Sequence, residues 1–144
     1  MFRNWLGGSR DMWVATSRDS GKSFSAKKVG EGTWVLNACP MDGGGLAVKA
    51  NGDIVTSWRR EQKIYWTDGA SFKAPDWAGK DSALALDGSG KPVIAWTEGT
   101  RLMIYDGEAR ELTPLGGFVT LAASGNGLVA AWEAGTGITV QRLR

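Results

Sequence analysis

Short apolar runs separated by turns rich in Gly, Asp and Asn recur along the chain. The clearest pair covers residues 46–50 and 54–58, on either side of Asn51-Gly52-Asp53. An Asn-Gly turn between two apolar runs is typical of a β-hairpin. Two further hairpins of this form span 83–96 and 119–132, around turns at 87–90 and 124–127. Helical periodicity is absent, so the pattern predicts an all-β protein.

The three hairpins are internal repeats. Each second strand ends in a tryptophan, and Trp58, Trp96 and Trp132 are spaced by 38 and 36 residues. A polar turn then leads to a third strand, expected at 63–66, 101–105 and 137–141. In the first two repeats an Asp-Gly turn precedes a weaker fourth strand, at 72–74 and 110–113.

The N-terminal stretch fits the same unit without its first strand. Phe2 stands where the tryptophan stands elsewhere, and residues 12–15 and 25–29 form the third and fourth strands. The predicted tally is therefore three, four, four and three strands. Antiparallel sheets of four strands that recur at this period are typical of β-propeller blades.

We therefore expect one partial-propeller domain over residues 1–144, with about 3.5 blades. The expected blades cover approximately 1–30, 43–76, 82–115 and 118–144. A β-sandwich with coincidental spacing is the alternative, but the aligned tryptophans favour the propeller. Trp58, Trp96 and Trp132 should then be buried between neighbouring blades rather than form a sugar-stacking platform.

Composition narrows the possible functions. The 144 residues carry a net charge of +2 with scattered basic side chains, which favours neither a nucleic-acid partner nor a membrane. No apolar run approaches the length of about 18 residues that spans a bilayer. The first ten residues lack the apolar region of a signal peptide.

The side-chain inventory excludes several mechanisms. The chain has no histidine, which excludes Ser-His-Asp and Cys-His nucleophiles and zinc sites that need imidazole. The single cysteine, Cys39, allows no intrachain disulfide, and we expect it to be a small buried residue. We expect no metal and no cofactor.

Residues Ser17 to Phe24 match the Asp-box, S-x-D-x-G-x-[ST]-[WF], and residues 67–72 form a shortened copy. With the segments 37–45 and 58–61, these motifs make essentially the whole chain resemble sialidase-like BNR-repeat propellers, in particular bacterial exo-sialidase-type proteins. The ending at 138–144 resembles the family's C-terminus, which implies a C-terminal half with the remainder upstream. The resemblance suggests a periplasmic or secreted location for the full-length protein.

The Asp-box is expected to be a structural clip rather than a ligand site. Asp19 can accept hydrogen bonds from backbone N–H groups of its turn, with Ser17 beside it, and Gly21 can supply an unusual backbone angle. Phe24 is expected to fill the core of its blade. In the family this motif lies away from the substrate face.

The expected topology places loops from fourth to first strands, and turns from second to third strands, on one face. The resemblance implies that ligand binds there. The face carries Asn37, Cys39 and Asp42 in one loop and Arg59, Arg60 and Glu61 in one turn. Guanidinium groups beside a carboxylate suit an anionic sugar. The favoured alternative is that Arg59 and Arg60 pair with Glu61 or neighbouring Asp residues to fix the turn.

Further candidates on this face are Asn4, Trp5, Arg10, Asp81, Glu98, Arg101 and Glu133. Trp5 and Trp77 fall in loop-like contexts and are candidates for stacking on a sugar.

Two possible functions follow from these candidates and from the resemblance. The first is a non-catalytic propeller module that binds glycan or protein through the Asn37–Asp42 loop and the Arg59–Glu61 turn. The alternative is an exo-α-sialidase whose site is completed by missing sequence or by another subunit.

No catalytic residue is assigned. The resemblance implies three arginines that hold the substrate carboxylate, a Tyr–Glu pair that acts as nucleophile and base, and an Asp that acts as general acid. The Arg-Ile-Pro element of the first arginine is absent here, and the two tyrosines, Tyr65 and Tyr105, fall within expected third strands.

A partial propeller leaves two end faces that a complete ring would cover. We expect these faces to be apolar, and we expect the first and last blades to have unpaired edges. The sequence therefore predicts a homo-oligomer, most simply a two-fold dimer that closes one ring of about eight blades.

Overall fold

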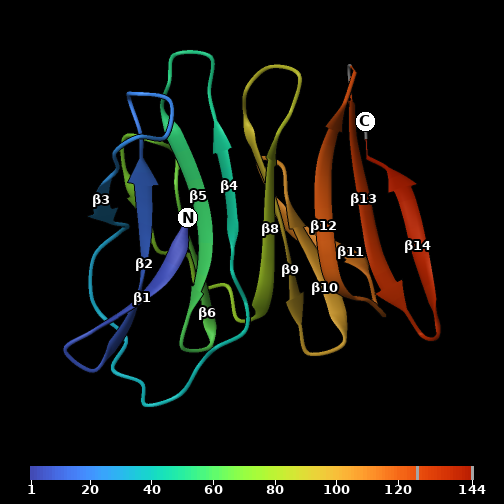
Figure 1. The fold of residues 1–144 in the computed structure, drawn as a ribbon. Coiled ribbons are helices and arrows are strands. Elements are labelled where there is room, and N and C mark those ends of the chain that lie inside the picture. The colour runs from blue at the N-terminus through green and yellow to red at the C-terminus, as the bar shows by residue number, and fades with distance from the viewer. Residues whose placement is uncertain (126, 144) are drawn as a thin grey trace.

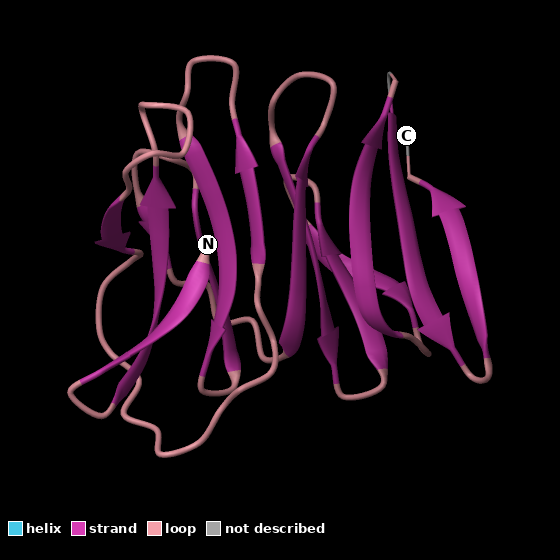
Figure 2. Ribbon diagram, viewed as in Figure 1, coloured by secondary structure: helices cyan, strands magenta, loops and turns pink. Residues whose placement is uncertain are grey.

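The computed structural model describes residues 1–125 and 127–143. Over these residues the chain forms strands and loops but no helix (Figure 2). The described residues therefore contain no helix that is long and apolar enough to cross a membrane. The strands form four antiparallel sheets, each built from consecutive strands. This confirms the all-β prediction.

The two outer sheets have three strands each. The first contains β1 (Phe2–Leu6), β2 (Ser9–Thr16) and β3 (Ser25–Lys28), and the fourth contains β12 (Gly117–Ser124), β13 (Gly127–Ala134) and β14 (Gly137–Arg142). The two middle sheets have four strands each. The second contains β4 (Gly45–Val48), β5 (Ile54–Arg60), β6 (Lys63–Thr67) and β7 (Phe72–Lys73), and the third contains β8 (Lys80–Leu86), β9 (Pro92–Glu98), β10 (Arg101–Tyr105) and β11 (Ala109–Thr113).

The predicted tally of three, four, four and three strands is confirmed. Figure 1 shows the sheets standing side by side in chain order, with β4, β8 and β12 adjacent. The same strand register recurs in three sheets: Trp58 pairs with Tyr65, Trp96 with Met103, and Trp132 with Thr139. In the first sheet Phe2 pairs with Trp13, as the repeat predicts. Asn126, in the third expected hairpin turn, lies outside the described residues.

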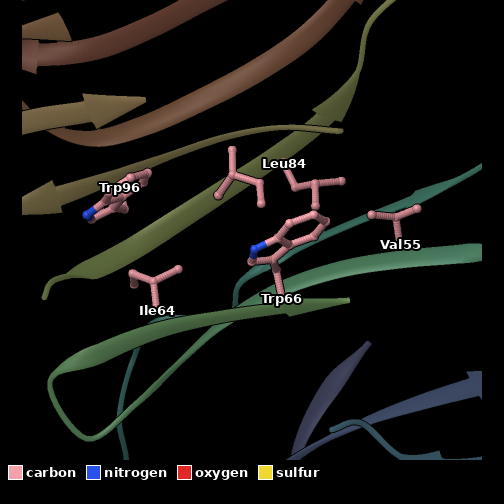
Figure 3. Close-up of a cluster of buried hydrophobic side chains, with 6 residues drawn as sticks. Val55, Ile64, Trp66, Leu84 and Trp96 are labelled. Carbon is pink, nitrogen blue, oxygen red and sulfur yellow. The ribbon is translucent and has the colours of Figure 1, made fainter. Parts of the chain in front are cut away.

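The three aligned tryptophans are buried, as predicted, at 3% exposure for Trp58, 1% for Trp96 and 5% for Trp132. The core lies between sheets. Ile64 and Trp66 of the second sheet meet Leu84 and Trp96 of the third in one apolar cluster (Figure 3). A second cluster joins the third sheet to the fourth through side chains that include Leu102 and Trp132.

The second and third sheets approach closely along their first strands. A Cβ added to Gly45 would lie 2.5 Å from the backbone nitrogen of Leu84. Beside it, the hydroxyl of Ser57 donates a hydrogen bond to that of Ser82 at 3.3 Å, and both residues are buried. The first and second sheets are less closely packed, because a cavity of about 630 Å³ lies between Val14 and Thr56.

Phe24 corrects one expectation. It is 66% exposed rather than packed in a core. Ser25, the first residue of β3, lines the cavity toward the second sheet, whereas Phe24, just before the strand, does not. No described sheet covers the Phe24 ring. In the shortened copy of the motif, Phe72 does pack, because its ring stacks on Trp58 and Tyr65 with centroids 6.0 and 5.7 Å away.

Candidate functional site

The Asp-box turn between β2 and β3 uses its polar groups internally. Asp19 accepts hydrogen bonds from the Ser23 hydroxyl at 2.6 Å, the Ser23 amide at 2.9 Å and the Ser17 hydroxyl at 2.8 Å. These bonds, above all that from the Ser23 hydroxyl, lower the pKa of Asp19 to about 2. Gly21 has a φ of 86°, as expected, and its amide donates to Ser17 at 2.8 Å.

The shortened copy between β6 and β7 has the same construction. Asp68 accepts backbone hydrogen bonds from Ser71 at 2.8 Å and Ala70 at 2.9 Å, and its pKa falls to about 2, chiefly because of the Ser71 amide. Figure 1 shows the β2–β3 turn at the opposite end of the sheets from the long loop that precedes β4. In both turns the aspartate therefore stabilises the turn itself through hydrogen bonds within the motif.

The long loop carries a half-buried ion cluster. Asp42 lies 2.7 Å from Nε of Arg59, and its other oxygen lies 3.8 Å from Arg3. Arg3 also donates to the backbone carbonyls of Arg10 at 2.9 Å and Arg59 at 3.1 Å. Both guanidinium groups lie over the ring of Trp34, at 5.2 and 5.4 Å from its centroid. The cluster therefore ties the first sheet, the long loop and the second sheet together.

Two guanidinium groups share one carboxylate in this cluster, which leaves an excess of positive charge. Burial lowers the pKa of Arg3 below its ordinary value, and the neighbouring charge of Asp42 opposes that effect. The side chain of Asp42 is 6% exposed and that of Arg59 is 18% exposed. Arg59 therefore pairs with an aspartate, as in the favoured alternative reading of the turn, in which its arginines fix the structure.

Arg60 and Glu61 do not join Arg59. Arg60 donates to the backbone carbonyl of Glu31 and lies over the ring of Tyr65, 4.2 Å from its centroid. Arg59 and Arg60 are both within β5, so their side chains point to opposite faces of the sheet. Glu61 is exposed in the following turn, with a φ of 57°. The structure therefore contains no shared clamp of these three residues.

A groove of about 660 Å³ runs across the starts of β4, β8 and β12. We call it the inner-strand groove. Its lining includes Met41–Gly45, Arg59, Lys80–Leu84 and Phe118–Leu121. The groove thus shares Asp42 and Arg59 with the ion cluster and extends over the third and fourth sheets.

The backbone adopts the left-handed region where each of these three strands begins, at the residue before β4 and at the second residue of β8 and of β12. Gly44 has a φ of 90°, Asp81 of 53° and Phe118 of 50°. These positions recur every 37 residues. Asp81 and Phe118 lie within the register shifts of β8 and β12. A bulky residue rarely adopts this conformation, and such outliers are concentrated at ligand sites.

Lys80, Asp81 and Phe118 form the polar and aromatic part of the groove. The Lys80 ammonium lies 3.7 Å from the Asp81 carboxylate and 5.9 Å from the centroid of the Phe118 ring. Phe118 is 64% exposed, and the Lys80 side chain is 52% exposed. Ammonium, carboxylate and an open aromatic face are groups that bind the charge, hydroxyls and apolar face of a sugar.

Several predicted site residues lie outside the groove. Asn37 is exposed in the long loop, and Cys39 is exposed rather than buried because that loop crosses the surface. Trp5 is 60% exposed on β1, with the Arg10 guanidinium 5.0 Å from its ring centroid. Trp77 is not an open stacking surface, because its ring packs on Trp96 with centroids 4.6 Å apart.

The remaining candidates are also dispersed. Glu98 and Arg101 pair with each other at 2.9 Å across the β9–β10 turn. Asn4 is half-buried on β1, and Glu133 is exposed on β13. Tyr65 stacks on Trp58, and Tyr105 packs against Trp66 and Trp77, so neither phenol lines the groove.

Sequence patterns pointed to Asp42, Arg59 and Asp81 but not to Lys80 and Phe118. A signal was available: Phe118 follows Asp81 by the same interval by which Asp81 follows Gly44. Comparison with protein-family models, with curated proteins and with solved structures finds no match for this chain.

Proposed function

We propose that this chain is a sialidase-like β-propeller module that binds a carboxylate-bearing glycan in the inner-strand groove and does not hydrolyse it alone. The propeller is supported by four consecutive antiparallel sheets that stand side by side with one repeated register. The Asp-box turns support the relation to BNR-repeat proteins. The binding role goes beyond these features and depends on the groove.

One observation carries the binding role: an exposed phenylalanine is held in a left-handed conformation beside a lysine and an aspartate. Phe118 has a φ of 50° and 64% exposure, so its backbone is strained while its side chain is exposed to solvent. Folding alone gains little from that arrangement. A ligand that stacks on the ring would account for the arrangement, since residues with a strained backbone cluster at ligand-binding sites.

The groove and the adjoining ion cluster together favour an acidic sugar by one net positive charge. Arg59 and Lys80 line the groove with Asp42 and Asp81, and Arg3, which lies 3.8 Å from Asp42 outside the lining, adds the further positive charge. A ligand carboxylate would pair with Lys80, while Asp81 would accept hydrogen bonds from sugar hydroxyls. Phe118 would stack on the apolar face of the ring. The proposed site therefore lies nearer the third sheet than a site on the Asn37–Asp42 loop would.

Hydrolysis by the chain alone is not supported. A retaining sialidase-type mechanism needs a phenol at the reacting carbon, and Tyr65 and Tyr105 lie in aromatic stacks away from the groove. A fluorogenic 4-methylumbelliferyl sialoside tests this directly. We expect no turnover. Release of the fluorophore that Arg59→Ala abolishes would establish the exo-sialidase alternative instead.

Calorimetric titration with N-acetylneuraminic acid and with its neutral methyl ester tests binding. We expect the acid to bind more tightly. Lys80→Ala should weaken binding of the acid about tenfold, which corresponds to about 1.4 kcal/mol, and should affect the ester little. Phe118→Ala should weaken both ligands, and Phe118→Tyr should restore them.

Lys91→Ala is the matched control, because Lys91 is an exposed lysine of the β8–β9 turn, at the other end of the same sheet from Lys80. It should bind like the unmodified chain. Equal affinity for the acid and the ester, or equal loss in the Lys80 and Lys91 variants, would contradict the proposed site.

A further inference from the structure

The C-terminal end of the row of sheets exposes positions that are buried elsewhere. On the third strand of each repeat, two alternate residues face the following sheet. They are Ile64 and Trp66 on β6, at 0% and 8% exposure, and Leu102 and Ile104 on β10, at 0% and 1%. On β14 the same register positions hold Ile138 and Val140, which are 67% and 65% exposed. We call the latter the C-terminal face.

Strand pairing establishes this equivalence. Ile64 pairs with the residue after Trp58, Leu102 with the residue after Trp96, and Ile138 with the residue after Trp132. The three positions are therefore the same point of the repeat. Ile138 differs only in that no described sheet follows it.

The N-terminal end exposes the opposite half of such a junction. In the second sheet the rings of Trp58, Tyr65 and Phe72 stack on the side facing the first sheet, where a Cβ added to Gly30, just after β3, would lie 2.6 Å from the Trp58 ring. In the first sheet the matching residues are Phe2, Trp13 and Phe24, which we call the N-terminal face. Phe2 is 42% exposed and Phe24 is 66% exposed.

Each internal junction of this type brings a tryptophan-bearing face onto an aliphatic face. Trp96 packs in one cluster with Ile64, and Trp132 packs in one cluster with Leu102. The N-terminal face offers the aromatic side of a junction, and the C-terminal face offers the aliphatic side. One chain thus carries both halves, at opposite ends, and no described sheet covers either of them.

We propose that a second copy of this chain covers both faces: Ile138 and Val140 of each copy pack on Phe2, Trp13 and Phe24 of the other. A two-fold axis makes the two junctions equivalent and closes the assembly. A face-to-itself dimer would cover one end and leave the other apolar face in water, which soluble proteins rarely do. Neither the inner-strand groove nor a ligand takes part in these two junctions.

Light scattering coupled to size exclusion tests the assembly on the full chain. We expect a mass twice that of the 15.4 kDa chain at tens of micromolar. Ile138→Glu and Phe24→Glu should each give a monomer, because either variant damages both junctions. Both side chains are largely exposed, so circular dichroism should show the fold intact. Val35→Glu, at a 77% exposed position of the long loop, should remain a dimer.

Mixing the two variants decides which faces meet. In a mixture, the intact C-terminal face of Phe24→Glu can pack on the intact N-terminal face of Ile138→Glu. We therefore expect a dimer that contains one copy of each variant and that neither variant forms alone. A monomeric unmodified chain, a larger open polymer, or a dimer that survives either single variant would overturn the proposal.

Discussion

The carboxylate of Asp42 lies 2.7 Å from the guanidinium of Arg59, and this contact joins a surface loop to the end of β5. Arg3 is the second ion-pair partner of Asp42, so the cluster joins three separate parts of the chain. The ring of Trp34 lies against the guanidinium groups of both arginines. The contact holds the rim of the inner-strand groove in place. The stability of that rim can be measured separately from any ligand.

Asp42→Ala should destabilise the protein by about 3 kcal/mol, because it leaves the buried guanidinium groups of Arg3 and Arg59 without their carboxylate. Urea unfolding gives the change in free energy. Asp76→Ala removes an ion pair of similar length, 2.6 Å to Lys63, at an exposed position and should change little. A similar loss in both variants would show that Asp42 is not held as described.

Trp96→Ala should lower the free energy of unfolding by about 3–5 kcal/mol, because it removes a large side chain from a packed junction. Trp96 is 1% exposed, stacks on Trp77, and donates a hydrogen bond to the Ala78 carbonyl at 3.1 Å. Guanidinium unfolding measures the loss. Trp5→Ala, at 60% exposure, is the control and should stay within about 0.5 kcal/mol. A loss under about 1 kcal/mol for Trp96 would contradict the junction.

Acid should weaken the protein between pH 4 and pH 2. The folded-state pKa of Asp19 and of Asp68 is about 2, below the value of about 3.9 in an unfolded chain. The stabilisation is therefore complete above the unfolded value and is lost as pH falls through the folded value.

Urea unfolding as a function of pH measures this loss. The double variant Asp19→Asn, Asp68→Asn should show a shallower decline between pH 4 and pH 2. Above pH 5 the stability of the two proteins should change with pH in parallel. An unchanged acid slope in the variant would mean that other groups cause the decline.

Phe118→Gly separates backbone strain from the ring. A left-handed conformation costs a residue with a side chain about 1–2 kcal/mol, and glycine adopts it freely. The 64% exposed ring contributes little burial. Phe118→Gly should therefore be at least as stable as the unmodified chain, whereas Phe118→Ala, which keeps the strain, should not gain. Both should lose affinity for the sugar. A glycine variant clearly less stable than the alanine variant would contradict the strain.

Sequence periodicity predicted the individual sheets closely. The hairpin turns, the strand tally and the burial of Trp58, Trp96 and Trp132 all followed from local pattern. Alternation fixes which side chains share a face, and turn residues fix where strands reverse, so neighbours in sequence determine these features. The hydrogen bonds of Asp19 followed in the same way, because the carboxylate and its donors lie within a few residues.

The residues that make up the candidate site depend on contacts between sheets, which local sequence pattern does not determine. Arg59 and Arg60 are adjacent in sequence, yet the extension of β5 through Arg60 sends them to opposite faces. Phe24 and Phe72 occupy the same motif position, but Phe72 stacks on Trp58 and lies against the chain that follows the first sheet at Gly30, whereas no described sheet covers Phe24.

Local pattern thus determined the repeated antiparallel units and the positions that each unit offers for burial. Tertiary structure alone decided that Asp42 pairs with Arg59, that Trp77 is covered by Trp96, and that Lys80 and Phe118 line one groove. The reason is physical: a strand's pattern specifies which face is apolar, whereas the burial of that face and the meeting of distant charges depend on which sheet stands beside it.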